Sequence, residues 1–182
     1  IVGSSIIRNA SEHSTGNYSN INLKPHNIAV RWFGKGGMIW EDLELFLHYI
    51  VSRFGQPGVI VVHCGENSIA SMSLCQLQKF MKLTISNMQA NFPTWKIFWS
   101  QILPRNYYRH SHSHIAAERA RKRIYSSFST LSFILSKGWG VHSLPSSWLL
   151  LAETVEGWNL FVRHWTIHIF EYNAGWFVQN HH

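Results

Sequence analysis

Two polar clusters follow directly on apolar runs and carry side chains that could do chemistry. Gly3-Ser4-Ser5 follows Ile1-Val2, and Gly65-Glu66-Asn67-Ser68 follows the continuous run 59–64. A serine placed directly after a glycine at a strand end has an exposed hydroxyl, which a nucleophile needs, but for this segment alone a cap for a following helix is the default interpretation. In open α/β sheets, ligands bind just past the carboxyl ends of the strands. Both clusters are therefore candidate site residues, although the second also fits a plain polar turn.

A third segment, Gly34-Lys35-Gly36-Gly37, could bind an anion through its backbone. Three glycines in four residues permit close backbone approach and can aim N–H groups at one anion. The segment is not a P-loop, because the Gly-Lys-Ser/Thr ending is absent. We expect it to supply a backbone N–H donor.

The apolar pattern predicts the elements that must position these residues. Pro57-Gly58 opens a run of β-branched residues that is typical of a strand buried on both faces of a parallel sheet. We expect strands at the start of the chain and at 27–33, 59–64, 96–100 and 138–142, with helices at 39–54, 72–92 and 115–135. Residues 9–27 are predicted to be a loop, 145–163 fit a helix or a strand, and 170–179 fit a short closing helix. This alternation predicts an α/β fold, a three-layer α/β/α sandwich around a parallel sheet.

The composition fits one globular domain. The chain has 182 residues, of which 46% are hydrophobic and 14% charged, and its net charge of +7 allows anionic partners. We expect a single domain over 1–182 that is a fragment of a longer chain, because the sequence starts at Ile1 inside an apolar segment. No apolar run reaches the length of a membrane span. Cys64 and Cys75 do not make a disulfide framework.

Four segments in chain order resemble the motif blocks of the SGNH hydrolases, also called the GDSL-type esterase/lipase superfamily. Gly3-Ser4-Ser5 stands in the place of the family's Gly-Asp-Ser, 33–37 resembles the second block, and 65–68 resembles Gly-x-Asn-Asp. The fourth segment, Trp165-Thr166-Ile167-His168, stands where the family has Asp-x-x-His. The resemblance spans nearly the whole chain. It implies a flavodoxin-like, five-stranded parallel sheet of order 2-1-3-4-5, with the site above its carboxyl edge.

The resemblance implies serine ester hydrolysis through an acyl-enzyme on Ser5. His168 would take the proton from Ser5 as it attacks an ester carbonyl, following the acyl-transfer template. The oxyanion would be held by the backbone N–H groups of Ser5 and Gly37, with Gly36 as second choice, and by the Asn67 amide. Acetyl, lipid and carbohydrate esters are all compatible substrates. No cofactor and no metal are expected.

The sequence departs from the family pattern at three acidic positions. Ser4, Ser68 and Trp165 stand where the family usually has Asp. Trp165 matters most, since the missing Asp orients the catalytic histidine, and its loss in serine hydrolases costs about 10⁴-fold in rate. A backbone carbonyl, or Glu171 in the next turn, could partly substitute. We therefore expect a weakened dyad of serine and histidine.

Other features indicate a second class of function. The segments 36–40 and 99–105 resemble a vertebrate SGNH subgroup carried by retrotransposons. A copy that had lost hydrolysis could persist as a nucleic-acid-binding or interaction module through a basic helix, or that helix could simply be a solvated face. The basic residues are Arg119, Arg121, Lys122 and Arg123. Histidines alternate at 110, 112 and 114 without the spacing of a known zinc site, so we expect no metal there.

Overall fold

In the part of the chain that the structure describes, the centre of the fold is a parallel sheet of five short strands. The computed structural model describes residues 1–17, 29–69, 71–105, 107–108, 111–126 and 140–142. The strands are β1 (Val2–Gly3), β2 (Phe33–Gly34), β3 (Val59–His63), β4 (Lys96–Ser100) and β5 (Gly140–His142). Their order is β2-β1-β3-β4-β5, and every neighbouring pair is parallel. The predicted fold class and the strand order 2-1-3-4-5 are confirmed.

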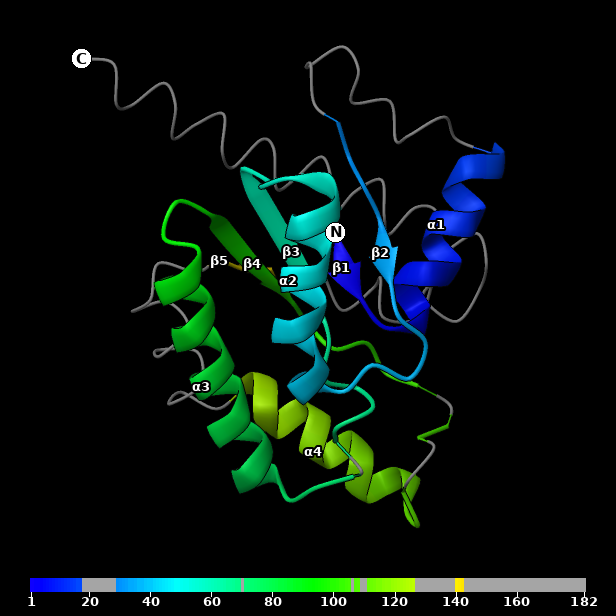
Figure 1. Cartoon of the computed structure of the whole chain (residues 1–182). Helices are drawn as coiled ribbons and strands as arrows, with labels where there is room; N and C mark the ends of the chain where they lie inside the picture. Colours follow the sequence, from blue (N-terminus) through cyan, green and yellow to red (C-terminus); the bar gives the residue numbers. More distant parts are fainter. Residues whose placement is uncertain (18–28, 70, 106, 109–110, 127–139, 143–182) are drawn as a thin grey trace, which may run out of the picture. The chain divides into compact units, whose positions relative to one another are not determined.

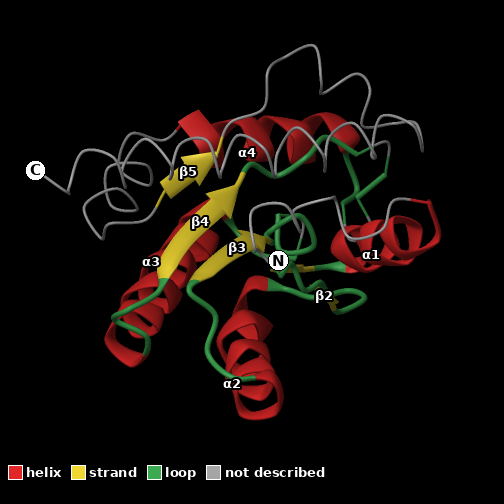
Figure 2. Cartoon of the chain, turned by 90° about the horizontal axis from the view of Figure 1, so that it is seen from above, coloured by secondary structure: helices red, strands yellow, loops and turns green. Residues whose placement is uncertain are grey.

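Helices lie on both sides of this sheet. They are α1 (Ser5–Asn17), the 3-10 turn η3 (Trp40–Asp42), α2 (Leu43–Phe54), α3 (Leu74–Asn91) and α4 (His114–Ser126). Figure 1 follows them along the chain, and Figure 2 shows α2 and α3 on one side of the sheet. The start of α1, residues 5–9, and α4 lie on the other side. This is the predicted three-layer arrangement.

The chain divides into two compact units. Residues 1–9 and 32–143 form the first unit, which contains the sheet, and residues 10–31 and 144–182 form the second. The expectation of a single domain over 1–182 stays a prediction. Within the described ranges, no helix combines the length and the apolar character that crossing a bilayer requires.

The strand β3 is the buried axis of the first unit. Four of its five side chains are buried, and it pairs with β1 on one side and with β4 on the other. Its neighbour β4 adds Trp99, which is fully buried and meets the ring of Trp40 edge-on at a centroid distance of 6.4 Å. The carboxyl ends of β1, β2 and β3 therefore meet at one edge, with a dense apolar core behind them.

Local sequence signals mark the start of α3 and the end of α2. α3 is capped by Ser73, whose hydroxyl accepts from the backbone N–H of Gln76 while the Gln76 side chain accepts from the backbone N–H of Ser73. α2 stops at Gly55, which adopts a φ of 81° that residues other than glycine rarely adopt. Buried residues recur along the two helices at helical spacing. They are Leu43, Leu47 and Ile50 in α2, and Leu77, Met81, Ile85 and Met88 in α3.

The start of the chain differs from the sequence-based prediction. Residues 9–17 were expected in a loop, but α1 continues to Asn17, so that assignment was wrong for this part. The large apolar residues of α1 are confined to Ile6 and Ile7, and apart from Ala10 and Gly16 the rest of the helix is polar, so the helical period was not visible. β2 covers Phe33–Gly34 and lies at the end of the predicted strand 27–33. The predictions for 145–163 and 170–179 lie outside the described residues.

Candidate active site

The two adjacent serines after β1 have different surroundings. Ser4 is fully buried, and its hydroxyl donates a hydrogen bond to Oε1 of Glu66. Ser5 is half-buried and is the first residue of α1, which starts directly beyond the carboxyl end of β1. The first N–H groups of a helix have no partner within the helix and carry its positive dipole end. Ser5 therefore has both the accessibility and the local field that a serine nucleophile needs.

Residues 65–68, directly after β3, form a tight turn that brings Asn67 next to Met38, the residue after the glycine segment 34–37. Gly65 has a φ of 123°, and its carbonyl accepts hydrogen bonds from the backbone N–H groups of Ser68 and Ile69, each at 3.1 Å. The hydroxyl of Ser68 accepts from the backbone N–H of Trp40 at 2.9 Å. This last bond joins the turn 65–68 to Trp40, three residues after Gly37.

The Asn67 side chain is held at both of its ends. Its Nδ2 donates to the backbone carbonyl of Met38 at 2.9 Å, one residue after Gly37. Its Oδ1 accepts from Nη1 of Arg105 at 3.3 Å. Gly37 itself is exposed and has a φ of 71°. The structure thus places the Asn67 side chain against the backbone of Met38, directly after Gly37.

A buried ion pair, absent from the sequence-based expectations, connects these clusters. Nη2 of Arg105 lies 3.1 Å from Oε1 of Glu66, whose side chain is completely buried. Burial raises the pKa of Glu66 to about 7, against the opposing charge of Arg105. Glu66 thus receives bonds from both Ser4 and Arg105. Arg105 lies five residues past the end of β4, so the rule that selected Asn67 could also have found it.

The predicted base and its neighbours fall outside the described residues. These are His168, the expected general base, Trp165, which replaces the usual Asp, and Glu171, the suggested substitute. The serines at the two other positions where the family has Asp make hydrogen bonds inside the structure. Ser4 is bonded to Glu66, and Ser68 accepts from the backbone of Trp40.

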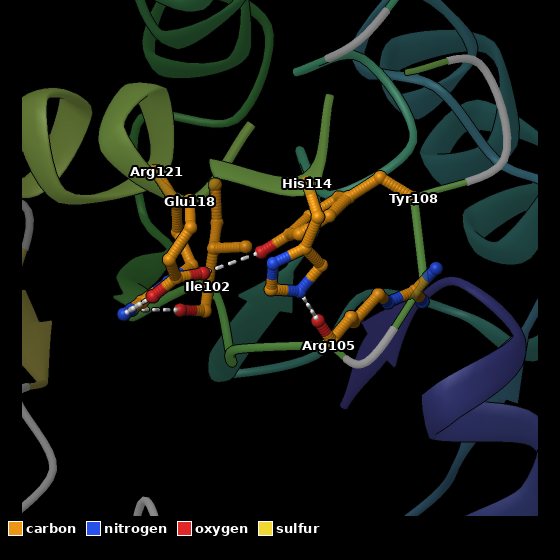
Figure 3. A network of polar contacts seen from close by, with 6 residues as sticks. All are labelled: Ile102, Arg105, Tyr108, His114, Glu118 and Arg121. Carbon is orange, nitrogen blue, oxygen red and sulfur yellow. Dashed lines mark hydrogen bonds and ion pairs between the residues drawn. The ribbon is translucent and has the colours of Figure 1, made fainter. Parts of the chain in front are cut away.

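The basic helix α4 does not present its four cations on one face. Arg121 is only 4% exposed and shares the buried face of α4 with Ala117 and Ile124, at i, i+4 and i+7 spacing. Its guanidinium bonds to Glu118 and, at 3.0 Å, to the backbone carbonyl of Ile102 (Figure 3). The expectation that Arg121 contacts nucleic acid is therefore corrected. The other three, Arg119, Lys122 and Arg123, are exposed.

The histidines of the preceding loop do not form a metal cluster in the described part of the chain. No group of three His, Cys, Asp or Glu residues is placed there to hold a metal ion. His112 is exposed, and Nε2 of His114 lies 2.7 Å from the backbone carbonyl of Arg105 (Figure 3). His110 lies outside the described residues.

Comparison with known proteins gives a likeness of fold. No protein-family model matches the chain, and no curated protein matches its sequence. A GDSL-like lipase from Bacteroides thetaiotaomicron VPI-5482 is similar in structure, with a TM-score of 0.56 and 13% sequence identity. A candidate acylhydrolase from Bacteroides fragilis NCTC 9343 is similar with a TM-score of 0.52 and 14% identity. Each comparison covers 77% of this chain and 64% of the other, so the chain spans slightly under two thirds of those proteins.

These neighbours agree with the fold that the sequence predicted. The parallel sheet with flanking helices is consistent with the fold of GDSL-like hydrolases. At so low an identity the likeness concerns the fold, and the chemistry has to be argued from the residues of this chain.

Proposed function

We propose that this chain is a hydrolase of the SGNH kind that cleaves esters through an acyl-enzyme on Ser5. The observation that carries the proposal is the convergence of three clusters at one edge of the sheet. Ser5 begins α1 directly after β1, and Asn67 follows the adjacent strand β3. The Asn67 amide contacts the carbonyl next to Gly37. The fold's likeness to a GDSL-like lipase and a candidate acylhydrolase supports the same class of reaction.

The proposed reaction uses these residues in separate roles. Ser5 Oγ attacks the ester carbonyl, its proton passes to His168, and the alcohol leaves with that proton. Water then hydrolyses the acyl-enzyme by the same route. The backbone N–H groups of Ser5 and Gly37 hold the oxyanion together with the second N–H of the Asn67 amide. An amide nitrogen has two hydrogens, and only one of these is needed for Met38.

The acid that orients the histidine is missing from the usual position, where Trp165 stands. We propose a dyad of Ser5 and His168, in which a backbone carbonyl or Glu171 partly replaces the acid. Such a dyad is slower than a full triad by up to about 10⁴-fold. The substrate is an acetyl, lipid or carbohydrate ester. No step of this reaction requires a cofactor.

Labelling with a fluorophosphonate probe tests this function. In the labelling reaction the bond from Ser5 Oγ to phosphorus forms, the P–F bond breaks, and the proton passes to His168. We expect the parent protein to react slowly, Ser5→Ala and His168→Ala to be unreactive, and Trp165→Asp to react faster. Labelling of Trp165→Asp alone would indicate a decayed site on an intact scaffold. If none of the four proteins reacts, the hydrolase proposal is overturned.

The alternative is an inactive SGNH-like domain, derived from a retroelement, that binds nucleic acid. The resemblance of 36–40 and 99–105 to the retrotransposon-carried subgroup motivates it, and three exposed cations of α4 would contact phosphate: Arg119, Lys122 and Arg123. The comparisons lend nucleic-acid binding no support. Replacing these three residues by alanine should then weaken binding and reduce its dependence on salt, measured with a single-stranded oligonucleotide.

A further inference from the structure

Arg105 lies between the two side chains that fix the geometry of the candidate site. Nη1 donates to Oδ1 of Asn67 at 3.3 Å, and Nη2 donates to Oε1 of Glu66 at 3.1 Å. One guanidinium therefore binds two neighbouring residues of the same turn through two different nitrogens. A lysine has a single nitrogen at its end and cannot reproduce this rigid fork.

The contact with Arg105 determines which way the Asn67 amide points. A carboxamide has an acceptor oxygen at one end and a donor nitrogen at the other, and a half-turn exchanges them. The Met38 carbonyl is an acceptor, so the amide nitrogen must face it. The Arg105 guanidinium is a donor, so the amide oxygen must face Arg105. Both partners select the same orientation. In it, the nitrogen points to Met38, which directly follows the glycine segment that the proposed oxyanion site uses.

Glu66 anchors the guanidinium from the buried side. Its carboxylate is inaccessible, whereas the Arg105 side chain is 20% exposed. The same carboxylate oxygen accepts from the hydroxyl of Ser4, the residue before the proposed nucleophile. Arg105 therefore bonds Asn67 directly. It is also linked, through the Glu66 carboxylate, to Ser4, the residue before Ser5.

Helix α4 fixes the backbone that presents Arg105. Figure 3 shows three contacts from α4, which go to Ile102, Arg105 and Tyr108. Arg121 donates to the carbonyl of Ile102, and Nε2 of His114 lies 2.7 Å from the carbonyl of Arg105. Glu118 accepts from the hydroxyl of Tyr108 at 2.9 Å. Contacts on both sides of Arg105 therefore limit where its side chain can reach.

We propose that Arg105 is a positioning residue, which acts on the reaction by holding the Asn67 amide with its nitrogen toward the oxyanion. The proposal rests on the proposed function, since it assigns Arg105 a part in that same site. Loss of an oxyanion donor costs about 10²–10³ in rate. Without Arg105 the amide is held by the Met38 carbonyl alone and loses part of this contribution, so Arg105→Ala should react with the fluorophosphonate at least about tenfold more slowly.

A double-mutant cycle with Asn67→Ala distinguishes positioning from general support. If Arg105 acts through Asn67, the Arg105→Ala change should add less than about twofold to the loss already caused by Asn67→Ala. Arg105→Lys should be as slow as Arg105→Ala. The control is Arg53→Ala, which removes an exposed guanidinium from the end of α2 and should leave the rate unchanged. The proposal would be overturned by full reactivity of Arg105→Ala. It would also be overturned if the rate losses of the two single mutants multiplied in the double mutant.

Two further measurements keep the test decisive. Because Arg105→Ala leaves Glu66 buried without its cation, the cycle is repeated in a Glu66→Gln background, where that charge is gone. The side-chain amide signals of Asn67 in ¹⁵N spectra, assigned by their loss in Asn67→Asp, report its orientation without any activity. They should shift in Arg105→Ala and stay in Arg53→Ala. If neither the parent protein nor Trp165→Asp reacts, the proposed function fails, whereas unshifted Asn67 signals overturn the role of Arg105.

Discussion

Gly34 of β2 lies directly against the backbone of Arg8 in α1. A Cβ atom built on Gly34 would come within 2.2 Å of the Arg8 nitrogen and within 2.5 Å of its Cα. Both of these are backbone atoms, so they cannot move aside as a flexible side chain could. The helix that begins at Ser5 can therefore lie over β2 only because residue 34 has no side chain.

Gly34→Ala should destabilise the protein by about 1–3 kcal/mol or more, since a methyl group would be forced into occupied space. Gly58→Ala is the matched control, because nothing lies within 4 Å of its added Cβ. Chemical denaturation of the three proteins measures the difference. Equal stabilities of the two variants would show that α1 does not pack against β2 so closely.

Asn67→Ala should slow fluorophosphonate labelling by about 10²–10³-fold, because it removes a donor to the proposed oxyanion. The control is Asn91→Ala, which removes an exposed amide at the end of α3 that donates to Glu44 at 3.3 Å. Its labelling rate should match that of the parent protein. An Asn67→Ala protein that stays folded and labels at the parent rate would remove Asn67 from the proposed mechanism.

Acid should destabilise the protein through His63. Burial lowers the pKa of His63 from 6.5 to about 3, and the charge of Arg105 adds to this effect. Between these two values the unfolded chain binds a proton that the folded protein does not. Stability is therefore retained above pH 6.5 and is lost progressively as the pH falls toward 3.

The measurement is the thermal midpoint of the parent and of His63→Gln across this range. Glutamine can keep a bond to the hydroxyl of Ser100, which lies 3.1 Å from Nδ1 of His63. The difference between the two curves isolates His63, because Glu66, whose raised pKa acts in the opposite direction, is present in both proteins. Two parallel curves would contradict a buried, neutral His63.

Arg121→Ala should destabilise the protein, whereas Arg119→Ala should change its stability by less than about 0.5 kcal/mol. Arg121 is buried and bonds both Glu118 and the Ile102 carbonyl, so its loss leaves two acceptors without this donor. Although burial acts to raise it, hydrogen bonds from Arg121 and Tyr108 hold the pKa of Glu118 below its usual value. Thermal melts compare the variants, and similar melting points would argue against the buried placement of Arg121.

The sequence predicted β3 and β4 well because these strands are short apolar runs between turn signals. Val59–His63 and Lys96–Ser100 were found within one residue of their ends. The position of Asn67 followed from the same logic, since a polar residue directly past a buried strand lies at the carboxyl edge. The order of the strands came from the family resemblance.

The remaining features depend on contacts that no local pattern records. Arg105 and Glu66 are 39 residues apart in sequence, and only the fold brings them together. In α4, charge alone suggested one basic surface. The spacing of Ala117, Arg121 and Ile124 was the available signal that Arg121 belongs to the buried face instead.

The two residues of β1 find both of their partners far along the chain. Val2 pairs with Phe33 on one side and with Val62 on the other. Loops of some 30 and 60 residues must therefore close before either contact contributes, and such topologies fold slowly. Ser5, two residues after β1, is fixed in position only after β1 has paired with both β2 and β3. A chain that has collapsed without pairing β1 would carry every residue of the site and still be unreactive, so reactivity at Ser5 should appear during refolding together with the final cooperative step.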